Sequence, residues 1–200
     1  MFTGLIKAQG VVADVVRDPE GATLSVEAEL AWALSVGDSI AVNGVCLTAT
    51  AVGKGRFSAA VMAQTLALTT LGELTAGRRV NLELPVAAGQ RFDGHIVQGH
   101  VDGVGEVRAA VNRGFALELT IAPPQRLLRY IVPQGSIAVD GVSLTVAAVA
   151  PGSFTVSLIP ETQRRTTLGG LVAGDRVNLE VDVLAKYVER LVARANGENG

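Results

Sequence analysis

The segment VNGVCLTAT at residues 42–50 recurs as VDGVSLTVA at residues 139–147, and the two copies differ mainly at polar positions. The match extends without a gap from residues 39–83 to residues 136–180, and 25 of these 45 pairs are identical. The offset of 97 positions between the copies exceeds the repeat length of most solenoids, which is roughly 20–50 residues. The sequence therefore indicates a duplicated domain.

A weaker repeat lies N-terminal to this match. GLIKAQGVV at residues 4–12 resembles GHVDGVGEV at residues 99–107, at an offset of 95 positions instead of 97. We therefore predict two domains, residues 1–90 and residues 96–183.

Short Val-rich segments that alternate apolar and polar residues fill each copy, and glycine-containing turns separate them. This pattern is typical of strands in a small antiparallel barrel or sandwich. We therefore predict an all-β protein. In the first copy the expected strands lie within residues 23–30, 39–45, 57–63 and 79–86.

Three segments break the strand pattern. Residues 123–131 (PPQRLLRYI) predict a short helix with Pro124 at its first position. The corresponding segment of the first copy is expected to stop at Gly37. Residues 182–195 predict a longer helix with Asp182 as its N-cap. Its apolar stripe, which either packs on its own barrel or forms a subunit contact, comprises Leu184, Tyr187, Val188, Leu191, Val192 and Ala195.

Composition excludes several classes of protein. Hydrophobic residues make up 48% and charged residues 18%, which is typical of a globular chain. The net charge of −2 argues against nucleic acid and anionic membranes as partners. One cysteine suits a reducing compartment, and neither a signal peptide nor a membrane-spanning stretch is recognisable. We expect a cytoplasmic protein.

The residues offer little for metal or hydrolase chemistry. His95 and His100 are the two histidines, and their spacing would place them on opposite faces of a strand, so no metal site is predicted. Ser143, His100 and Asp140 could be named as a triad. The segment DGVSLT nevertheless lacks the glycine pattern of a nucleophile elbow.

The polar positions of the repeat have a structural and a functional interpretation. Asn43-Gly44 and Asp140-Gly141 resemble type I′ turns, and Cys46 could be a small buried apolar residue. Their joint recurrence instead favours two similar ligand sites that use small hydrogen-bonding groups. On this interpretation, Ser39, Cys46, Thr48 and Thr65 correspond to Ser136, Ser143, Thr145 and Thr162.

Six segments in order resemble one known family over essentially the whole chain. They are MFTGLI, NGVCLT, GHIVQGHVDG, SIAVDGVSLTV, LIPETQRRTTLG and VNLEVDVLAKYVERL. Together they resemble the riboflavin synthases of the lumazine-binding repeat type. The resemblance implies two six-stranded Greek-key barrels, with residues 184–200 as an oligomerisation helix and tail that hold a homotrimer.

The resemblance also implies a reaction. Two molecules of 6,7-dimethyl-8-ribityllumazine exchange a four-carbon unit, giving riboflavin and 5-amino-6-ribitylaminouracil without cofactor or metal. Each barrel would bind one lumazine, and the active site would form between barrels of neighbouring subunits. Lumazine synthase is a candidate partner. The alternative is a relative that binds lumazine or flavin without turnover.

Carried over by position, the resemblance assigns substrate-binding residues to both barrels. The first pocket would comprise Phe2, Thr3, Gly4, Leu5, Ile6, Ser39, Cys46, Leu47, Thr48, Ala60, Val61, Met62, Ala63, Gln64, Thr65, Gly99, His100 and Val101. The second would comprise Gln134, Ser143, Leu144, Thr145, Leu158, Ile159, Pro160, Glu161, Thr162 and Gln163.

The same resemblance implies catalytic roles. Imidazole titrates near neutral pH, so His100 is the expected proton carrier. Ser143 and Thr145 would orient water or polarise the acceptor, Asp140 would position them, and Cys46 would activate the other substrate. The chain departs from the family at Gln134, commonly Lys, and at Gln64, commonly Glu; Asp93 replaces a common glycine.

Overall fold

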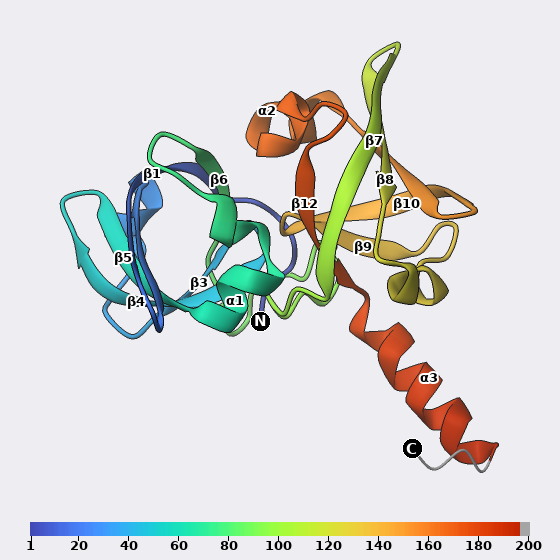
Figure 1. Cartoon of the computed structure of the whole chain (residues 1–200), viewed down its shortest axis with the longest axis horizontal. Helices are drawn as coiled ribbons and strands as arrows, with labels where there is room; N and C mark the ends of the chain where they lie inside the picture. Colours follow the sequence, from blue (N-terminus) through green and yellow to red (C-terminus); the bar gives the residue numbers. More distant parts are fainter. Residues whose placement is uncertain (197–200) are drawn as a thin grey trace.

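The first half of the chain forms a closed antiparallel barrel (Figure 1). This computed structural model describes residues 1–196. Around the barrel the strands follow the order β1-β2-β5-β4-β3-β6, and β6 pairs back with β1. Their bounds are β1 (Ala8–Asp18), β2 (Gly21–Glu27), β3 (Ser39–Val42), β4 (Val45–Gly53), β5 (Arg56–Met62) and β6 (Arg79–Glu83).

The second half repeats this architecture. Its strands follow the order β7-β8-β11-β10-β9-β12, which matches the first barrel when six is subtracted from each number. The β-bulge between Ala49 and Ala51 recurs between Val146 and Ala148. The two barrels confirm the predicted all-β class. The strand bounds are β7 (Gly103–Arg113), β8 (Ala116–Ala122), β9 (Ser136–Val139), β10 (Val142–Ala150), β11 (Ser153–Leu158) and β12 (Arg176–Val181).

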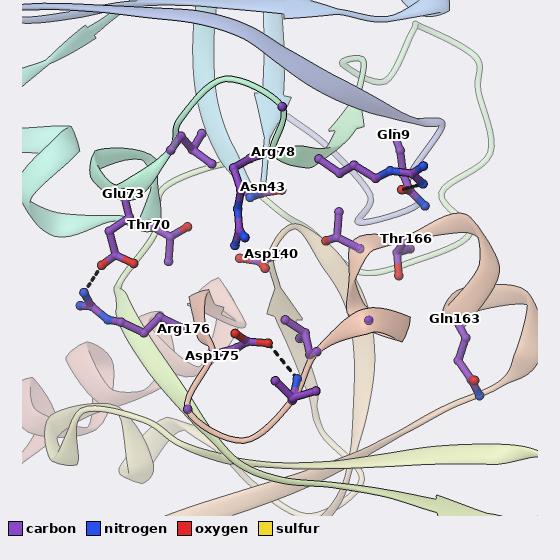
Figure 2. A pocket seen from close by; sticks show the side chains of 18 of the residues that line it. Gln9, Asn43, Thr70, Glu73, Arg78, Asp140, Gln163, Thr166, Asp175 and Arg176 are labelled. Atoms are coloured by element: carbon purple, nitrogen blue, oxygen red, sulfur yellow. Dashed lines mark hydrogen bonds and ion pairs between the residues drawn. The ribbon is translucent and has the colours of Figure 1, made fainter.

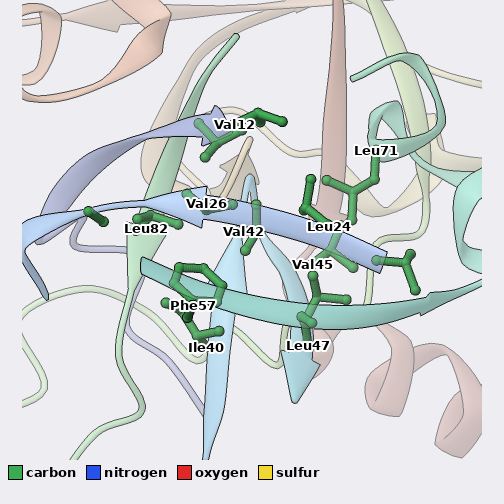
Figure 3. Packing of buried hydrophobic residues seen from close by; sticks show 14 of the residues in the cluster. Val12, Leu24, Val26, Ile40, Val42, Val45, Leu47, Phe57, Leu71 and Leu82 are labelled. Carbon is green, nitrogen blue, oxygen red and sulfur yellow. The ribbon is translucent and has the colours of Figure 1, made fainter. Parts of the chain in front are cut away.

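Each barrel has its own apolar core. Alternate residues of every strand point inward, because successive side chains of a strand face opposite sides. Figure 3 shows this in the first barrel, where Phe57 and Ile40 pack among valines and leucines. Phe154 and Ile137 occupy the equivalent positions of the second core. At about 25 cal/mol per Å² of buried apolar surface, these cores are the main source of stability.

Short helices connect the strands, and two sequence expectations need correction. The helix expected at residues 123–131 is a 3₁₀ helix from Gln125 to Tyr130. Pro124 is its N-cap, because its ψ of 135° is not helical. The equivalent 3₁₀ helix, Glu29–Ala33, ends before Gly37. Four short helices were not predicted from the sequence: α1 (Ala63–Leu68), α2 (Pro160–Arg165) and the 3₁₀ helices Thr70–Glu73 and Thr167–Gly170.

The last described element, α3 (Val183–Ala195), extends away from both barrels (Figure 1). Asp182 caps it as predicted, accepting a hydrogen bond from the Leu184 backbone N–H at 2.9 Å. An ion pair of 2.6 Å between Lys186 Nζ and Asp102 Oδ1 ties it to the second barrel. The predicted apolar stripe is exposed, with Leu191 66% accessible. Residues 197–200 of the predicted tail lie outside the described part of the chain.

The two barrels meet through their repeated hairpins. Asn43 and Asp140 adopt φ values of 45° and 44°, as the predicted type I′ turns require. The backbone N–H groups of Asn81 and Asn178 donate to Asn43 Oδ1 and Asp140 Oδ1, each at 2.7 Å. The Asn81 side chain then donates to the Asp140 carbonyl, and that of Asn178 to the Asn43 carbonyl. The contact therefore has an approximate two-fold axis.

Candidate functional site

Each barrel presents a polar outer surface on its third and fourth strands. In the first barrel, Ser39 lies opposite Thr48 and Ala41 opposite Cys46. Because Leu47 packs into the core, its neighbours Cys46 and Thr48 face outward. We call this surface the first face. At the end of β5, Met62 is 71% accessible, and Gln64 of the following helix α1 is exposed.

The second barrel repeats this surface as the second face. Ser136 lies opposite Thr145, and Ser143 lies opposite Ala138. The exposed Ile159 occupies the position of Met62 and precedes α2. Three of the expected binding residues instead pack their side chains into a barrel core: Leu47 and Val61 in the first barrel and Leu158 in the second.

Two extended segments cross between the faces. We call Phe2–Gly4 the first arm and Val97–Gly99 the second arm. The Gly99 carbonyl accepts a hydrogen bond from the Cys46 backbone N–H at 2.9 Å, so the second arm borders the first face. The Gly4 carbonyl accepts from the Ser143 backbone N–H at 2.8 Å, so the first arm borders the second face.

This crossing separates residues that the sequence analysis grouped together. Residues 2–6 were expected beside Cys46, but Gly4 lies against Ser143 on the other barrel. The expectation for Gly99 agrees with its contact to Cys46. His100 follows the second arm with an exposed side chain, and its backbone N–H donates to Glu180 Oε2 at 3.0 Å.

A histidine that received no role from the sequence lies on the second face. His95 Nδ1 is 2.7 Å from Ser143 Oγ. Its Nε2 is buried and has no hydrogen-bond partner among residues 1–196. Burial lowers the pKa of His95, and the charge of Asp182 opposes this shift in part. A neutral imidazole bonded to a hydroxyl can accept or deliver a proton. No local motif links His95 to Ser143 across 48 positions.

Asp140 lies away from these hydroxyls. Its buried carboxylate is held at the barrel contact by the Asn178 N–H. Burial raises the pKa of Asp140 from 3.8 to about 7, the Asn178 hydrogen bond opposes the shift, and the charge of Asp175 adds to it. No hydrogen bond joins Asp140 to Ser143 or Thr145 among the interactions of residues 1–196.

A cleft of about 820 Å³ opens between the barrels beside Asp140 (Figure 2). Asn43 and Asp140 line it from equivalent positions, and an ion pair between Glu73 and Arg176 crosses it. Of the expected binding residues, Gln163 also lines it. Neither Cys46 nor Ser143 is part of this lining, so the cleft does not include the central residues of the two faces.

The remaining expected residues differ in their exposure and contacts. Gln134 is exposed and adopts a φ of 65° at the position that corresponds to Gly37. Pro160 begins α2, where Glu161 forms ion pairs with Arg164 and Arg165. The Gln163 side chain donates to the Leu158 carbonyl at 2.8 Å, and Leu144 packs partly against the core. On the first face, Ala60 and Ala63 are exposed, and Thr65 and Val101 are half-buried.

Two further findings concern the described residues. Among residues 1–196 no cluster of His, Cys, Asp and Glu could hold a metal ion. In the same range, every helix is too short or too polar to cross a membrane.

Comparison with known proteins gives consistent matches. The model of the lumazine binding domain matches residues 3–85 and 98–182. Riboflavin synthase from Mycobacterium bovis is 49% identical, covering 98% of this chain and 100% of the relative. The riboflavin synthase of Schizosaccharomyces pombe is 43% identical, covering 96% of this chain and 94% of the relative. That of Bacillus subtilis is 39% identical, covering 98% and 92%.

Solved structures show the same fold. LumP complexed with riboflavin superposes with a TM-score of 0.85 at 23% identity, covering 90% of this chain and 99% of LumP. LumP complexed with 6,7-dimethyl-8-(1′-D-ribityl) lumazine gives a TM-score of 0.82 at 22% identity, with the same coverage.

Proposed function

The chain belongs to the lumazine binding domain family, and we propose that it is a riboflavin synthase. Two molecules of 6,7-dimethyl-8-ribityllumazine react, and one transfers a four-carbon unit to the other. The products are riboflavin and 5-amino-6-ribitylaminouracil, which together contain all the atoms of the two substrates. The full-length similarity to riboflavin synthases of bacteria and yeast supports this activity.

One structural observation carries the proposal. The two faces share strand order, register and small polar side chains, but they differ where chemistry needs a reactive group. Cys46 lies on the first face, whereas Ser143 bonded to His95 lies on the second. A reaction between two identical molecules requires two pockets of the same shape but unequal chemistry, because one substrate gives carbons and the other takes them.

The residues of the faces suggest roles in that reaction. His95, kept neutral by burial, exchanges a proton with the Ser143 hydroxyl. Thr145 orients the substrate of the second face, and Cys46 and His100 act on that of the first. Asp140 contributes only through the hairpin that leads to Ser143. Both substrates are held in place, and such orientation can supply roughly 7–11 kcal/mol of the barrier.

We also propose the organisation of the chain. Residues 1–90 and 96–183 each form one lumazine-binding unit, and residues 184–200 join subunits into a homotrimer. Greek-key connectivity, a cytoplasmic setting and an association with lumazine synthase belong to the same proposal. The homotrimer is supported by the exposed apolar stripe of α3 and by the exposed side chains of Met62 and Ile159, which a neighbouring subunit would cover.

Incubating the purified protein with the lumazine alone tests the activity. We expect half a mole of riboflavin per mole of lumazine consumed, without added cofactor. Tight binding of lumazine without release of riboflavin would instead identify a non-catalytic carrier.

Disrupting the α3 stripe tests the trimer. Replacing Leu184 and Leu191 by Glu places charges on the apolar stripe, so we expect monomers by light scattering. The matched control is Arg190→Glu, a charge change at an exposed polar position of the same helix. A trimer that survives the double substitution would exclude α3 as the subunit contact.

A further inference from the structure

The two arms pair with each other between the barrels. The Phe2 backbone N–H donates to the Val97 carbonyl at 2.7 Å, and the Val97 N–H donates to the Phe2 carbonyl at 3.1 Å. Phe2 is fully buried, and the pair packs on Ala41 and Ala138, which are equivalent residues of β3 and β9. The arms therefore share one small apolar cluster on the two-fold axis.

A buried glutamate at the end of each barrel clamps the arm that belongs to that barrel. Glu180 of β12 accepts backbone N–H bonds from Gln98 at 2.6 Å, Gly99 at 2.9 Å and His100 at 3.0 Å. It is 3% accessible, and burial raises its pKa while these hydrogen bonds oppose the shift. A carboxylate that accepts several backbone N–H bonds forms a strong, directional contact.

Glu83 of β6 makes the equivalent clamp on the first arm. It accepts from the Thr3 backbone N–H and the Thr3 hydroxyl at 2.7 Å, and from the Gly4 N–H at 2.9 Å. It is 2% accessible, and burial again raises its pKa against the hydrogen bonds. The two clamps occupy corresponding positions of the repeat.

Each clamped arm then contacts the opposite barrel. A Cβ added to Gly99 would lie 2.5 Å from Cys46 Cβ, and one added to Gly4 would lie 2.5 Å from Ser143 Cβ. Both glycines have positive φ, 81° and 76°. The arms therefore contact Cys46 and Ser143, the central residues of the two faces. At both contacts the arm lies so close that only a glycine fits.

We propose that Glu180 and Glu83 are positioning residues that act across the barrels: Glu180 of the second barrel sets the geometry around Cys46, and Glu83 of the first barrel sets that around Ser143. The relevance to catalysis rests on the proposed riboflavin synthase activity. The positioning itself is a property of the folded chain and is measurable without substrate.

Cys46 provides the readout for the first face, because it is the one cysteine of the sequence. Glu180→Gln keeps the size of the side chain but turns one acceptor oxygen into an N–H₂ donor that faces backbone N–H groups. We expect the second arm to loosen and the rate of Cys46 modification by dithionitrobenzoate to rise about tenfold, as for loss of a charge-assisted hydrogen bond. Glu83→Gln should leave this rate unchanged.

The second face is tested in a Cys46→Ser, Ser143→Cys background, where the thiol lies beside the first arm. Here Glu83→Gln should raise the rate of thiol modification by a similar factor, and Glu180→Gln should not. This crossed pattern separates positioning from general destabilisation, which would expose both thiols in either variant. If each glutamate affected the thiol of its own barrel, or if neither had an effect, the proposal would be wrong.

A second pair of variants covers the case in which a glutamine variant does not fold. Gly99→Ala and Gly4→Ala push the same arms away by steric overlap, and the same crossed pattern is expected. Turnover measured on folded variants should fall in all four. Crossed thiol reactivity in a protein that makes no riboflavin would support the positioning and reject the enzyme. Riboflavin formation without the crossed pattern would support the enzyme activity and reject the positioning role of the two glutamates.

Discussion

The two barrels share their framework and differ in what the connection between them supplies. Strand order, bulges, clamping glutamates and hairpins all recur. The histidines, however, have no counterpart in the first barrel: His95, from the segment between the two repeats, bonds Ser143, and His100 follows the arm that borders Cys46. The residue that follows the first arm at the position equivalent to His100 is Leu5. The two faces therefore differ both within the repeat, where Cys46 corresponds to Ser143, and in the histidine that lies next to each of them.

The two hairpins at the barrel contact differ in one side chain, Asn43 in the first barrel and Asp140 in the second. The change from Asn43 to Asp140 looks like a difference between two ligand pockets in the sequence. In the structure both side chains accept the same backbone hydrogen bond at the barrel contact. The difference is therefore one of charge in a buried, nearly symmetric interface.

Breaking that interface should have the largest effect. A Cβ on Gly141 would lie 2.7 Å from the Gly44 backbone N, and its φ of 77° is unfavourable for alanine. We expect Gly141→Ala to lower the free energy of unfolding by about 4 kcal/mol, from the sum of backbone strain and overlap. Urea denaturation measures this loss. The control is Gly152→Ala, with a similar φ of 81° but no atom within 4 Å; an equal loss there would contradict the steric account.

Replacing Asp140 by Asn, so that both hairpins carry an amide side chain, should have the next largest effect on the free energy of unfolding. Because burial raises the pKa of Asp140 to about 7, the folded state binds more protons than the unfolded state between pH 4 and pH 7. Stability contributed by this group is present at low pH and is lost as the pH rises toward 7. Asp140→Asn keeps the acceptor for Asn178 and should add about 2 kcal/mol at pH 8 but little at pH 4.

The reciprocal variant is the control for this prediction. Asn43→Asp should destabilise the protein at pH 8 more than at pH 4. Parallel pH profiles of unfolding for wild type and Asp140→Asn would show that Asp140 does not titrate in this range.

Removing the ion pair across the cleft should have the smallest effect. Glu73 pairs with Arg176, whereas the corresponding position of the second copy is Gly170, so the bridge exists on one side of the axis. Both side chains are about half exposed. We expect Glu73→Ala to cost about 0.5 kcal/mol or less and to lose its effect in high salt. A loss above 2 kcal/mol in thermal unfolding would mean that this pair holds the barrels together.

Sequence reasoning was most successful where the signal is local. The φ values of Asn43 and Asp140 agree with a type I′ turn, which was one of two interpretations of the Asx-Gly pairs. Asp182 was correctly predicted as a helix N-cap, because a cap depends on a few neighbouring residues. Sequence reasoning failed at Pro124, whose extended ψ makes it a cap instead of the first helical residue. It missed α1 and α2, which are each six residues long and too short to show a clear helical period.

The repeat and the alternation of apolar and polar residues predicted a duplicated all-β domain, a barrel or a sandwich, and the resemblance to lumazine-binding proteins implied that each copy is a six-stranded barrel. Which arm borders which face became clear only from the folded arrangement of the two barrels. The Gly4–Ser143 and Gly99–Cys46 hydrogen bonds join backbone groups, which nearly every residue carries, so the side-chain sequence does not predict them. The role of His95 was missed for a different reason: its side-chain partner, Ser143, is 48 positions away and comes near only when both barrels and their connection are folded.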